Sequence, residues 1–271
     1  MGYIVSETIF YVYPIIMEKN KVCVISSNNM IKKIYQAFYN KLPNSLKDIL
    51  PVYERCKIVT CLNAYYMVKL KEEDYHWYDE FDYIASDGMG PIKLNKLCGH
   101  SKSSRFSFDL SSMAGPVFRD MMAHGESLYV LGAKSGEVEK SVETIKKNFD
   151  GIKIAGFHHG YIKDCKNDIV KEIKASGAKV VIIGMGAPMQ DEIAVLLKQA
   201  GFVGSVYTCG GFIHQTQETM VSFPAWTNKL GLRWLYRIFT QSGMLKRLVE
   251  TYPIFVVTYI WFLLFQIKTR K

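Results

Sequence analysis

Residues 179–200 read KVVIIGMGAPMQDEIAVLLKQA, and this stretch contains three successive structural signals. The apolar, β-branched run at 179–183 predicts a buried strand. A turn with two glycines, Gly184 and Gly186, follows it, and apolar residues at helical spacing predict a helix over 190–200. A strand that leads through a short turn into an amphipathic helix is part of a βαβ unit. The stretch therefore predicts a parallel sheet covered by helices.

The same alternation extends in both directions along the chain. Short apolar runs predict further strands at 22–26, 57–60, 83–85, 127–131, 151–155 and 204–207. Helical patterns follow several of these runs, at 28–39, 63–73, 137–148 and 168–176. Strands alternating with helices of about ten residues predict an α/β fold with a mostly parallel sheet.

The last part of the chain differs in pattern and in charge. After Pro224 the pattern is wholly helical, which predicts an α/β domain at 1–223 and a helical appendage at 224–271. Between 228 and 271 there are eight basic residues and one acidic residue, which give +7 of the chain's formal +9. Positive charge concentrated in a tail indicates a local anionic partner rather than nucleic acid.

An apolar run of 17 uncharged residues at 251–267 lies within this appendage, between lysine and arginine residues. The run is short for a spanning helix, which needs about 20 apolar residues. Its aromatic residues and basic flanks favour a helix that lies in the lipid interface. The alternative is a final helix of the protein core.

Cysteine and histidine spacing indicates structural thiols and predicts no metal site. The six cysteines lie far apart without a Cys-x-x-Cys pair, which is typical of a reducing compartment. The six histidines lack the spacing of known zinc motifs. The apolar stretch at 9–17 has no basic residue before it and no cleavage site after it, so we expect a buried first strand rather than a signal peptide.

Three glycine-containing turns, at 87–90, 132–136 and 184–187, fall at the carboxyl ends of predicted strands, where ligands bind in such sheets. The turn at 184–187 opens a helix, so its backbone N–H groups can hold a phosphate. It matches neither the dinucleotide fingerprint nor the Walker loop. The alternative is that the glycines serve turn geometry alone.

Asp87 lies between a predicted strand and two glycines, a position from which a carboxylate can act as a general base. The alternative is an Asx-turn or a helix cap. His159, in the sequence His158-His159-Gly160, either binds a ligand or closes a turn, and for an isolated histidine pair we favour the turn. The segment 95–107, rich in Lys, Ser and Gly, predicts a mobile flap.

Taken together, seven segments resemble the WecG/TagA/CpsF glycosyltransferases, which elongate polyprenyl-diphosphate-linked sugars in bacterial surface-polymer synthesis. The segments are IVTCLNAYYMV, SDGMGPI, RFSFDLSSMAGPVF, LGAKSGEVEKSVETIKKNFDGIKIAGFHHGYI, VVIIGMGAPMQDE, CGGF and PAWTNKLGLRWLYRI. Their order and spacing, rather than any single motif, carry the resemblance.

The resemblance implies a Rossmann-like domain with helices on both faces and a C-terminal appendage that meets the membrane. It implies an inverting transfer without metal or cofactor, from a UDP-sugar to a lipid-diphosphate-linked sugar, in capsule, polysaccharide or teichoic acid synthesis. The expected partners are the donor, the acceptor and the membrane surface, and not nucleic acid. The expected location is peripheral, on the cytoplasmic face of the bacterial membrane. The oligomeric state stays open, a homo-oligomer included.

The resemblance also implies roles for individual residues, with Asp87 as the catalytic base. The donor pocket would contain Asn63, Gly132, Gly184, Gly186 and Gln190. The acceptor diphosphate would be held by Arg233, Arg237 and Arg247. Further candidates for the site are Thr60, Cys61, Arg105 and His159.

Five sites depart from the family pattern, two of them in the last segment: Ser222-Phe223-Pro224 stands where the family has Arg-Ala-Pro, and Arg233 replaces a glutamate. Cys61 stands where the family often has threonine, with Thr60 adjacent; Asp191 replaces a glutamate; and His214 stands near a common acidic position. These departures argue against assigning N-acetylmannosamine as the donor. The alternatives from other classes are a non-catalytic nucleotide-binding module and a tail-anchored scaffold at the membrane.

Overall fold

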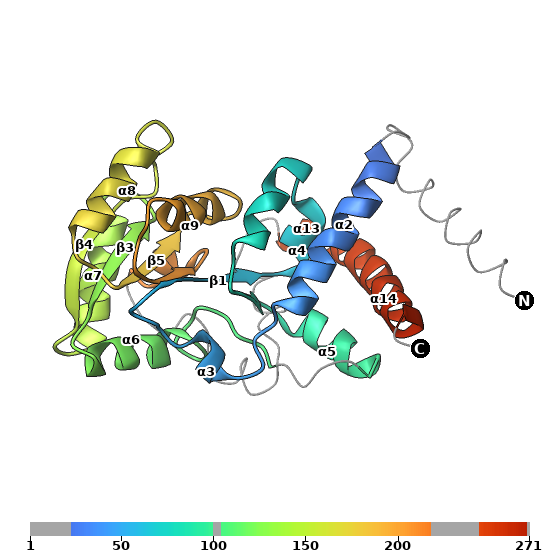
Figure 1. Cartoon of the computed structure of the whole chain (residues 1–271), viewed down its shortest axis with the longest axis horizontal. Helices are drawn as coiled ribbons and strands as arrows, with labels where there is room; N and C mark the ends of the chain where they lie inside the picture. Colours follow the sequence, from blue (N-terminus) through green and yellow to red (C-terminus); the bar gives the residue numbers. More distant parts are fainter. Residues whose placement is uncertain (1–22, 100–103, 218–243, 270–271) are drawn as a thin grey trace, which may run out of the picture.

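A six-stranded sheet forms the centre of the protein, whose computed structural model describes residues 23–99, 104–217 and 244–269 (Figure 1). All neighbouring strands are parallel, in the order β2-β1-β6-β5-β3-β4. The strands are β1 (Cys56–Leu62), β2 (Tyr83–Ser86), β3 (Ser127–Gly132), β4 (Lys153–His158), β5 (Val180–Gly184) and β6 (Gly204–Thr208). The predicted parallel α/β fold is therefore confirmed.

Helices cover both faces of the sheet, as predicted. On one face lie α2 (Cys23–Asn40), α4 (Ala64–Lys69), α8 (Lys166–Ala175), α9 (Met189–Gln199) and α14 (Tyr252–Thr269). On the other face lie α3 (Leu46–Ile49), α6 (Ala114–Ala123), α7 (Glu137–Asn148) and α10 (Phe212–Gln215). Strand β5 shows why: Val181 and Ile183 join the first core, while Val180 and Ile182 join the second. Figure 1 shows α8 and α9 above the sheet and α3 and α6 below it.

The strand predicted at 22–26 is wrong from Cys23 onward, because α2 already begins there and continues to Asn40. Its buried residues Ile31, Ile34, Tyr35 and Phe38 recur at helical spacing and face the core. A short apolar run cannot be distinguished from part of a buried helix by its own periodicity. The strand predicted at 9–17 lies outside the described residues.

The loop predicted from residue 95 is wrong in its first part, because α5 (Met89–Leu97) includes Asn95. Asn95 is fully buried, and its Oδ1 accepts a hydrogen bond from the Tyr259 hydroxyl at 2.9 Å. Ser107, at the other end of the segment, is 5% exposed. The segment predicted as a flap is thus anchored in the core at both ends, while 100–103 lie outside the described residues. The 3-10 helix η1 (Glu72–Asp79) and helix α6 were not predicted.

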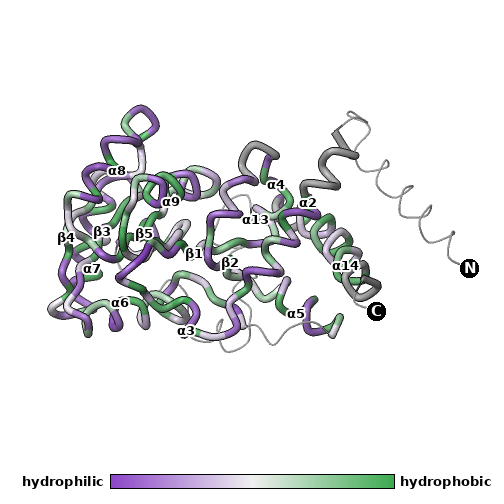
Figure 2. Tube along the Cα trace, in the orientation of Figure 1, coloured by the Kyte–Doolittle hydropathy of each residue, from purple (hydrophilic) through white to green (hydrophobic). Residues whose placement is uncertain are grey.

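Helix α14 packs on the core, one of the two alternatives considered for the C-terminal apolar run, and also leaves apolar side chains exposed. Phe255, Tyr259, Phe262 and Leu263 are buried, and the Tyr259 ring lies 4.9 Å from the ring of Tyr35 in α2. Other apolar side chains on α14 are 39–52% exposed, namely Val256, Val257, Trp261 and Leu264. Figure 2 shows the helix as largely hydrophobic. Across the described residues, no helix is long and apolar enough to cross a membrane.

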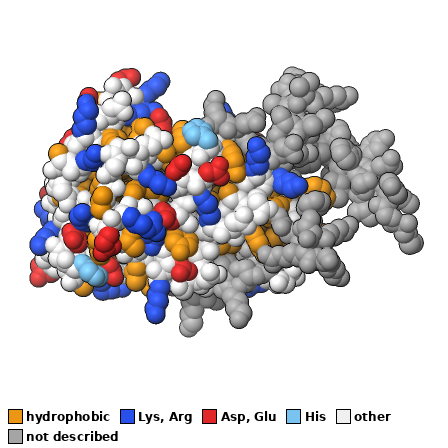
Figure 3. All heavy atoms as spheres, in the orientation of Figure 1, with side chains coloured by type: hydrophobic (Ala, Val, Ile, Leu, Met, Phe, Trp, Pro, Cys, Tyr) orange, Lys and Arg blue, Asp and Glu red, His pale blue; other side chains and the backbone are white. Residues whose placement is uncertain are grey.

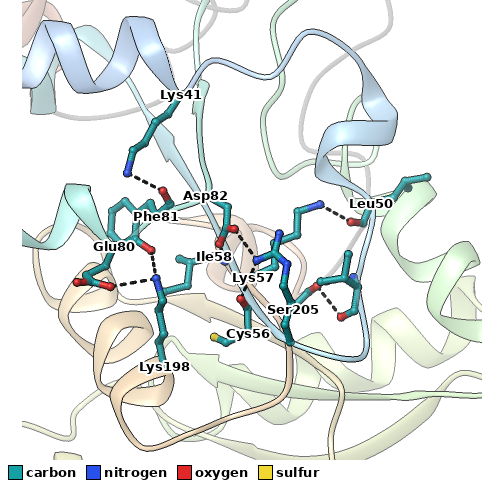
Figure 4. A network of polar contacts seen from close by, with 12 residues as sticks. Lys41, Leu50, Cys56, Lys57, Ile58, Glu80, Phe81, Asp82, Lys198 and Ser205 are labelled. Atoms are coloured by element: carbon teal, nitrogen blue, oxygen red, sulfur yellow. Dashed lines mark hydrogen bonds and ion pairs between the residues drawn. The ribbon is translucent and has the colours of Figure 1, made fainter.

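A network of polar contacts fixes the amino end of β1 (Figure 4). Asp82 accepts hydrogen bonds from Arg55 at 2.6 Å and from the Ile58 backbone N–H at 2.9 Å. The buried Lys57 ammonium donates to the Leu50 carbonyl at 2.8 Å. This network lies at the edge of the sheet opposite the strand carboxyl ends, so we assign it a structural role. Basic and acidic side chains are interspersed on the face seen in Figure 3, as expected for a nearly neutral α/β domain.

Candidate active site

A cavity of about 890 Å³ lies along the carboxyl edge of the sheet. Each strand contributes to its lining through the segment that follows it: Asp87 after β2, Asn63 after β1, Gly210 after β6, Gly186 after β5, Lys134 after β3 and Tyr161 after β4. Parallel strands bring their carboxyl ends to one edge, which is why turns distant in sequence meet here. The predicted meeting of the three glycine turns at this edge is confirmed.

The Asp87 carboxylate lines the cavity at the end of β2 and is held in place by a hydrogen bond. Its backbone N–H donates to the Leu62 carbonyl at 2.8 Å, which extends the pairing of β2 with β1. Its side chain is 26% exposed, and Oδ1 accepts a hydrogen bond of 2.6 Å from the Ser107 hydroxyl. With one oxygen fixed and the group open to the cavity, the carboxylate can take a proton from a bound hydroxyl.

Arg105 acts on this carboxylate through Ser107. Its guanidinium donates to the Ser107 Oγ at 2.7 Å and to Asp109 at 2.8 Å, but lies 3.9 Å from Asp87. Ser107 has a single hydroxyl hydrogen, and its oxygen is 2.6 Å from Asp87 and 3.1 Å from Asp109. The shorter contact indicates that Ser107 donates mainly to Asp87. Ser107 and Asp109 line the cavity, and sequence reasoning missed both, although they lie within the quoted segment 105–118.

Cys61 and Thr60 point to opposite faces of β1, because side chains alternate along a strand. Cys61 lines the cavity, and burial, aided by the charge of Asp87, raises the pKa of its thiol and keeps it neutral. Thr60 is fully buried, and its hydroxyl donates to Asp191 at 2.9 Å and lies 2.7 Å from the Thr208 hydroxyl. The cavity therefore presents a thiol where the family often has a hydroxyl, and Thr60 does not line it.

Gln190 shapes the cavity by joining two turns. It is 3% exposed, and its Oε1 accepts hydrogen bonds from the backbone N–H groups of Gly186 at 3.2 Å and Gly210 at 3.1 Å. Gln190 thus fixes the turns after β5 and β6 relative to each other. These two N–H groups are occupied, so a phosphate bound here would use other donors.

Of the remaining residues predicted for the donor pocket, three line the cavity and one does not. Asn63 lines the cavity and caps α4, since its Oδ1 accepts from the Tyr66 N–H at 3.1 Å. Gly184 and Gly186 also line it. Gly132 does not; a Cβ there would meet the Gly184 carbonyl oxygen at 2.3 Å, and its φ is +148°. Glycine at 132 is required by the close approach of β3 to β5.

Glu137 and His214 meet at the far end of the cavity, and sequence reasoning had not selected Glu137. Glu137 Oε2 accepts a hydrogen bond of 3.1 Å from the Lys134 N–H and lies 3.1 Å from His214 Nδ1. The hydrogen bond from Lys134 lowers the pKa of Glu137, so the group stays charged. His159 closes a turn, because its Nδ1 accepts from the Tyr161 N–H at 3.2 Å.

The predicted acceptor arginines are only partly within the structure. Arg233 and Arg237 lie outside the described residues, as does the boundary near residue 224. Arg247 belongs to α13 (Met244–Glu250), and its side chain is also outside what is described. Within the described ranges, no three His, Cys, Asp or Glu side chains form a group that could hold a metal ion.

Comparisons with known proteins match most of the chain to one family. The model of the glycosyl transferase WecG/TagA/CpsF family matches residues 32–269. A UDP-Gal:alpha-D-GlcNAc-diphosphoundecaprenol beta-1,4-galactosyltransferase of Shigella boydii is 34% identical over 216 residues, which cover 79% of this chain and 90% of that protein.

Two further relatives are named N-acetylglucosaminyldiphosphoundecaprenol N-acetyl-beta-D-mannosaminyltransferases. The protein from Bacillus spizizenii is 27% identical over 178 residues, covering 62% of this chain and 65% of that protein. The protein from Staphylococcus aureus is 24% identical over 228 residues, covering 84% of each. The family match spans most of the chain, and the cavity lies within it. The chain therefore belongs to the WecG/TagA/CpsF family of glycosyltransferases.

Proposed function

We propose that this enzyme transfers a hexose from a UDP-sugar to the GlcNAc of GlcNAc-diphosphoundecaprenol, in the synthesis of a bacterial surface polymer. The acceptor is supported by the relatives, since the named galactosyl- and mannosaminyltransferases share it. The observation that carries the proposal is Asp87, a carboxylate held by Ser107 at the edge of a cavity large enough for a nucleotide sugar.

In the proposed reaction Asp87 is the general base. It takes the proton of an acceptor hydroxyl as that oxygen attacks the anomeric carbon of the donor. The bond between the anomeric carbon and the diphosphate oxygen breaks, and UDP leaves with the electron pair. A single displacement of this kind inverts the anomeric configuration. In this proposal the reaction needs no metal ion.

Galactose is the first donor sugar to test. The galactosyltransferase relative is 34% identical to this chain, and the match covers 90% of that relative's length. The two mannosaminyltransferases are 27% and 24% identical.

The acceptor is proposed to approach along the membrane. Arg233, Arg237 and Arg247 would hold its diphosphate, since guanidinium groups suit phosphate oxygens. The exposed apolar side chains of α14 would rest in the lipid interface on the cytoplasmic face. The inner side of the same helix packs on α2, so membrane contact would not require α14 to leave the core.

A donor panel tests the proposal. Purified protein is incubated with UDP-galactose, UDP-GlcNAc or UDP-N-acetylmannosamine and a short-chain GlcNAc-diphospholipid, with and without EDTA. We expect transfer from UDP-galactose that EDTA does not reduce, and a β-linked product by NMR. UDP binding without transfer from any donor would favour the non-catalytic module, and loss of transfer in EDTA would contradict metal independence.

A further inference from the structure

We infer that the end of the cavity over β3 and β4 is the nucleoside subsite of the donor, and that Glu137 there accepts a hydrogen bond from a ribose hydroxyl. The inference rests on the proposed function, because it takes a UDP-sugar as the donor. It adds a specificity-determining residue, Glu137, to which the family resemblance assigned no role and which lies far from Asp87 in the sheet.

The strand order places Glu137 far from the reacting centre. Asp87 follows the edge strand β2, and the strands β1, β6 and β5 stand between it and β3, which Glu137 follows. Neighbouring strands are about 4.8 Å apart, so β2 and β3 are separated by about 19 Å. The anomeric carbon must lie near Asp87, and the hexose and diphosphate extend from there. The nucleoside, at the other end of the donor, therefore falls over β3 and β4.

The Glu137 carboxylate is positioned to accept a hydrogen bond from a ligand in the cavity. Its Oε2 accepts a hydrogen bond from the Lys134 backbone N–H at 3.1 Å and also lies 3.1 Å from His214 Nδ1. Within the described residues no hydrogen bond reaches Oε1, and the Glu137 side chain is 22% exposed and lines the cavity. A charged carboxylate with one oxygen fixed and the other open is suited to a sugar hydroxyl, as in other nucleotide-binding sheets of this kind.

The surroundings of Glu137 suit a nucleoside better than a diphosphate. Lys134 and Lys163 are matched by Glu137 and Asp164, so this end of the cavity has little net charge. A diphosphate beside the Glu137 carboxylate would be repelled. Tyr161 lines the same end with 70% of its surface exposed, and offers a flat ring of the kind on which bases stack.

The competing explanation is that Glu137 only pairs with His214. That pair is exposed on the histidine side, where the His214 side chain is 65% accessible. Exposed ion pairs contribute little to stability, so the pairing alone does not account for a carboxylate fixed in a ligand cavity. The two explanations differ in a measurable way, because only one makes UDP binding depend on a ribose hydroxyl.

Calorimetric binding of UDP, 2′-deoxy-UDP and 3′-deoxy-UDP to the full chain tests the inference. We expect wild type to bind at least one deoxy analogue about tenfold more weakly than UDP, since hydrogen bonds to charged groups are the stronger ones. Glu137→Gln should bind UDP about as weakly as that analogue and discriminate less than threefold. Glu143→Gln, an exposed glutamate of the same helix, is the matched control and should behave as wild type.

Thermal unfolding of Glu137→Gln shows whether the fold is retained, and Glu137→Asp serves as a second variant with the charge kept. Undiminished discrimination in Glu137→Gln, or equal binding of all three nucleotides by wild type, would overturn the inference. Absence of UDP binding in wild type would overturn both this inference and the proposed donor. Ribose discrimination that depends on Glu137, without transfer to any acceptor, would overturn the proposed function alone.

Discussion

The contacts of Ser107 determine how the Asp87 carboxylate is presented. The serine hydroxyl lies 2.6 Å from Asp87 Oδ1, and the Arg105 guanidinium that approaches the same serine is neutralised by Asp109 at 2.8 Å. Arg105 thereby positions Ser107 without forming a close ion pair with Asp87, from which it is 3.9 Å away. The proposed base keeps one oxygen for the acceptor hydroxyl.

Replacing Ser107 tests this arrangement. We expect Ser107→Ala to lower kcat about tenfold, because a hydrogen bond to a charged group is lost, while UDP binding changes less than threefold. Ser107→Thr keeps the hydroxyl and should restore most of kcat. Ser176→Ala, which removes a hydroxyl at the C-cap of α8 that does not line the cavity, is the control. An unchanged kcat in Ser107→Ala would mean that Asp87 needs no such support.

The thiol of Cys61 offers a prediction about pH. Burial, and then the nearby Asp87 charge, raise the pKa of this thiol, and burial likewise raises the pKa of Cys209. A raised thiol pKa means that the reactive thiolate appears only above the usual thiol range. Iodoacetamide should therefore modify both residues slowly at neutral pH and faster as pH rises, as followed by mass spectrometry. Rapid modification at pH 7 would contradict the assignment.

At the scale of elements, α14 has two faces with different roles. Phe262 is buried against Tyr39 and Tyr35 of α2, whereas Val257 and Leu264 are about half exposed. Removing the whole helix would uncover the core, so a truncation cannot separate membrane contact from folding. Substitutions on single faces can.

Outer-face and inner-face variants of α14 should separate these roles. We expect the double variant Val257→Asp and Leu264→Asp to lose binding to anionic vesicles in sedimentation, with little change in unfolding free energy, because both side chains are exposed. Phe262→Ala should lower the unfolding free energy by about 3–5 kcal/mol through the cavity it leaves. Full vesicle binding by the double variant would contradict the interfacial role of α14.

The elements that could be predicted are those whose pattern is local. The strand at 179–183 and the helix at 137–148 follow from apolar runs and helical spacing, and α7 has the predicted bounds. The start of α2 could not be predicted, because its apolar residues near Cys23 resemble a strand when read alone. Helix α6 was not predicted; Gly115 and Pro116 lie in its first turn, where proline is well tolerated.

At the scale of the whole molecule, a buried polar cluster joins elements from distant parts of the chain. Asp191, at the start of α9, accepts hydrogen bonds from Thr60 of β1 at 2.9 Å and from Tyr78 of η1 at 3.1 Å. Thr208 of β6 completes the cluster through Thr60, at 2.7 Å. Asp191 adjoins Gln190, so the cluster also holds the residue that fixes the two turns of the cavity.

Neighbouring carboxylates of α9 allow a matched test of this cluster. Asp191→Ala should lower the unfolding free energy by about 3 kcal/mol, because it leaves buried hydroxyls without an acceptor. Glu192→Ala removes a partly exposed ion pair with Lys166 and should cost less than about 1 kcal/mol. Urea denaturation measures both. Equal losses for the two variants would show that Asp191 has no special structural role.

The site was predictable where residues act through backbone position, and not where they act through distant contacts. Asp87 and Gly186 could be selected because they follow predicted strands and must reach the carboxyl edge, whereas Asn63 was selected through the family resemblance. Ser107, Asp109 and Glu137 gave no such signal, since their roles depend on Asp87, Arg105 and His214, which only the fold brings near. The opposite orientations of Thr60 and Cys61 follow from strand alternation, but the register had to be known first.

The most direct test of the account is transfer by Asp87→Asn. With the best donor of the panel and a short-chain GlcNAc-diphospholipid, we expect Asp87→Asn to lower kcat by at least about a hundredfold, as loss of a general base does. UDP affinity, measured by calorimetry on the same protein, should stay within threefold, because Asp87 lies at the acceptor end of the cavity. Transfer by Asp87→Asn at a rate near that of wild type would contradict the central claim.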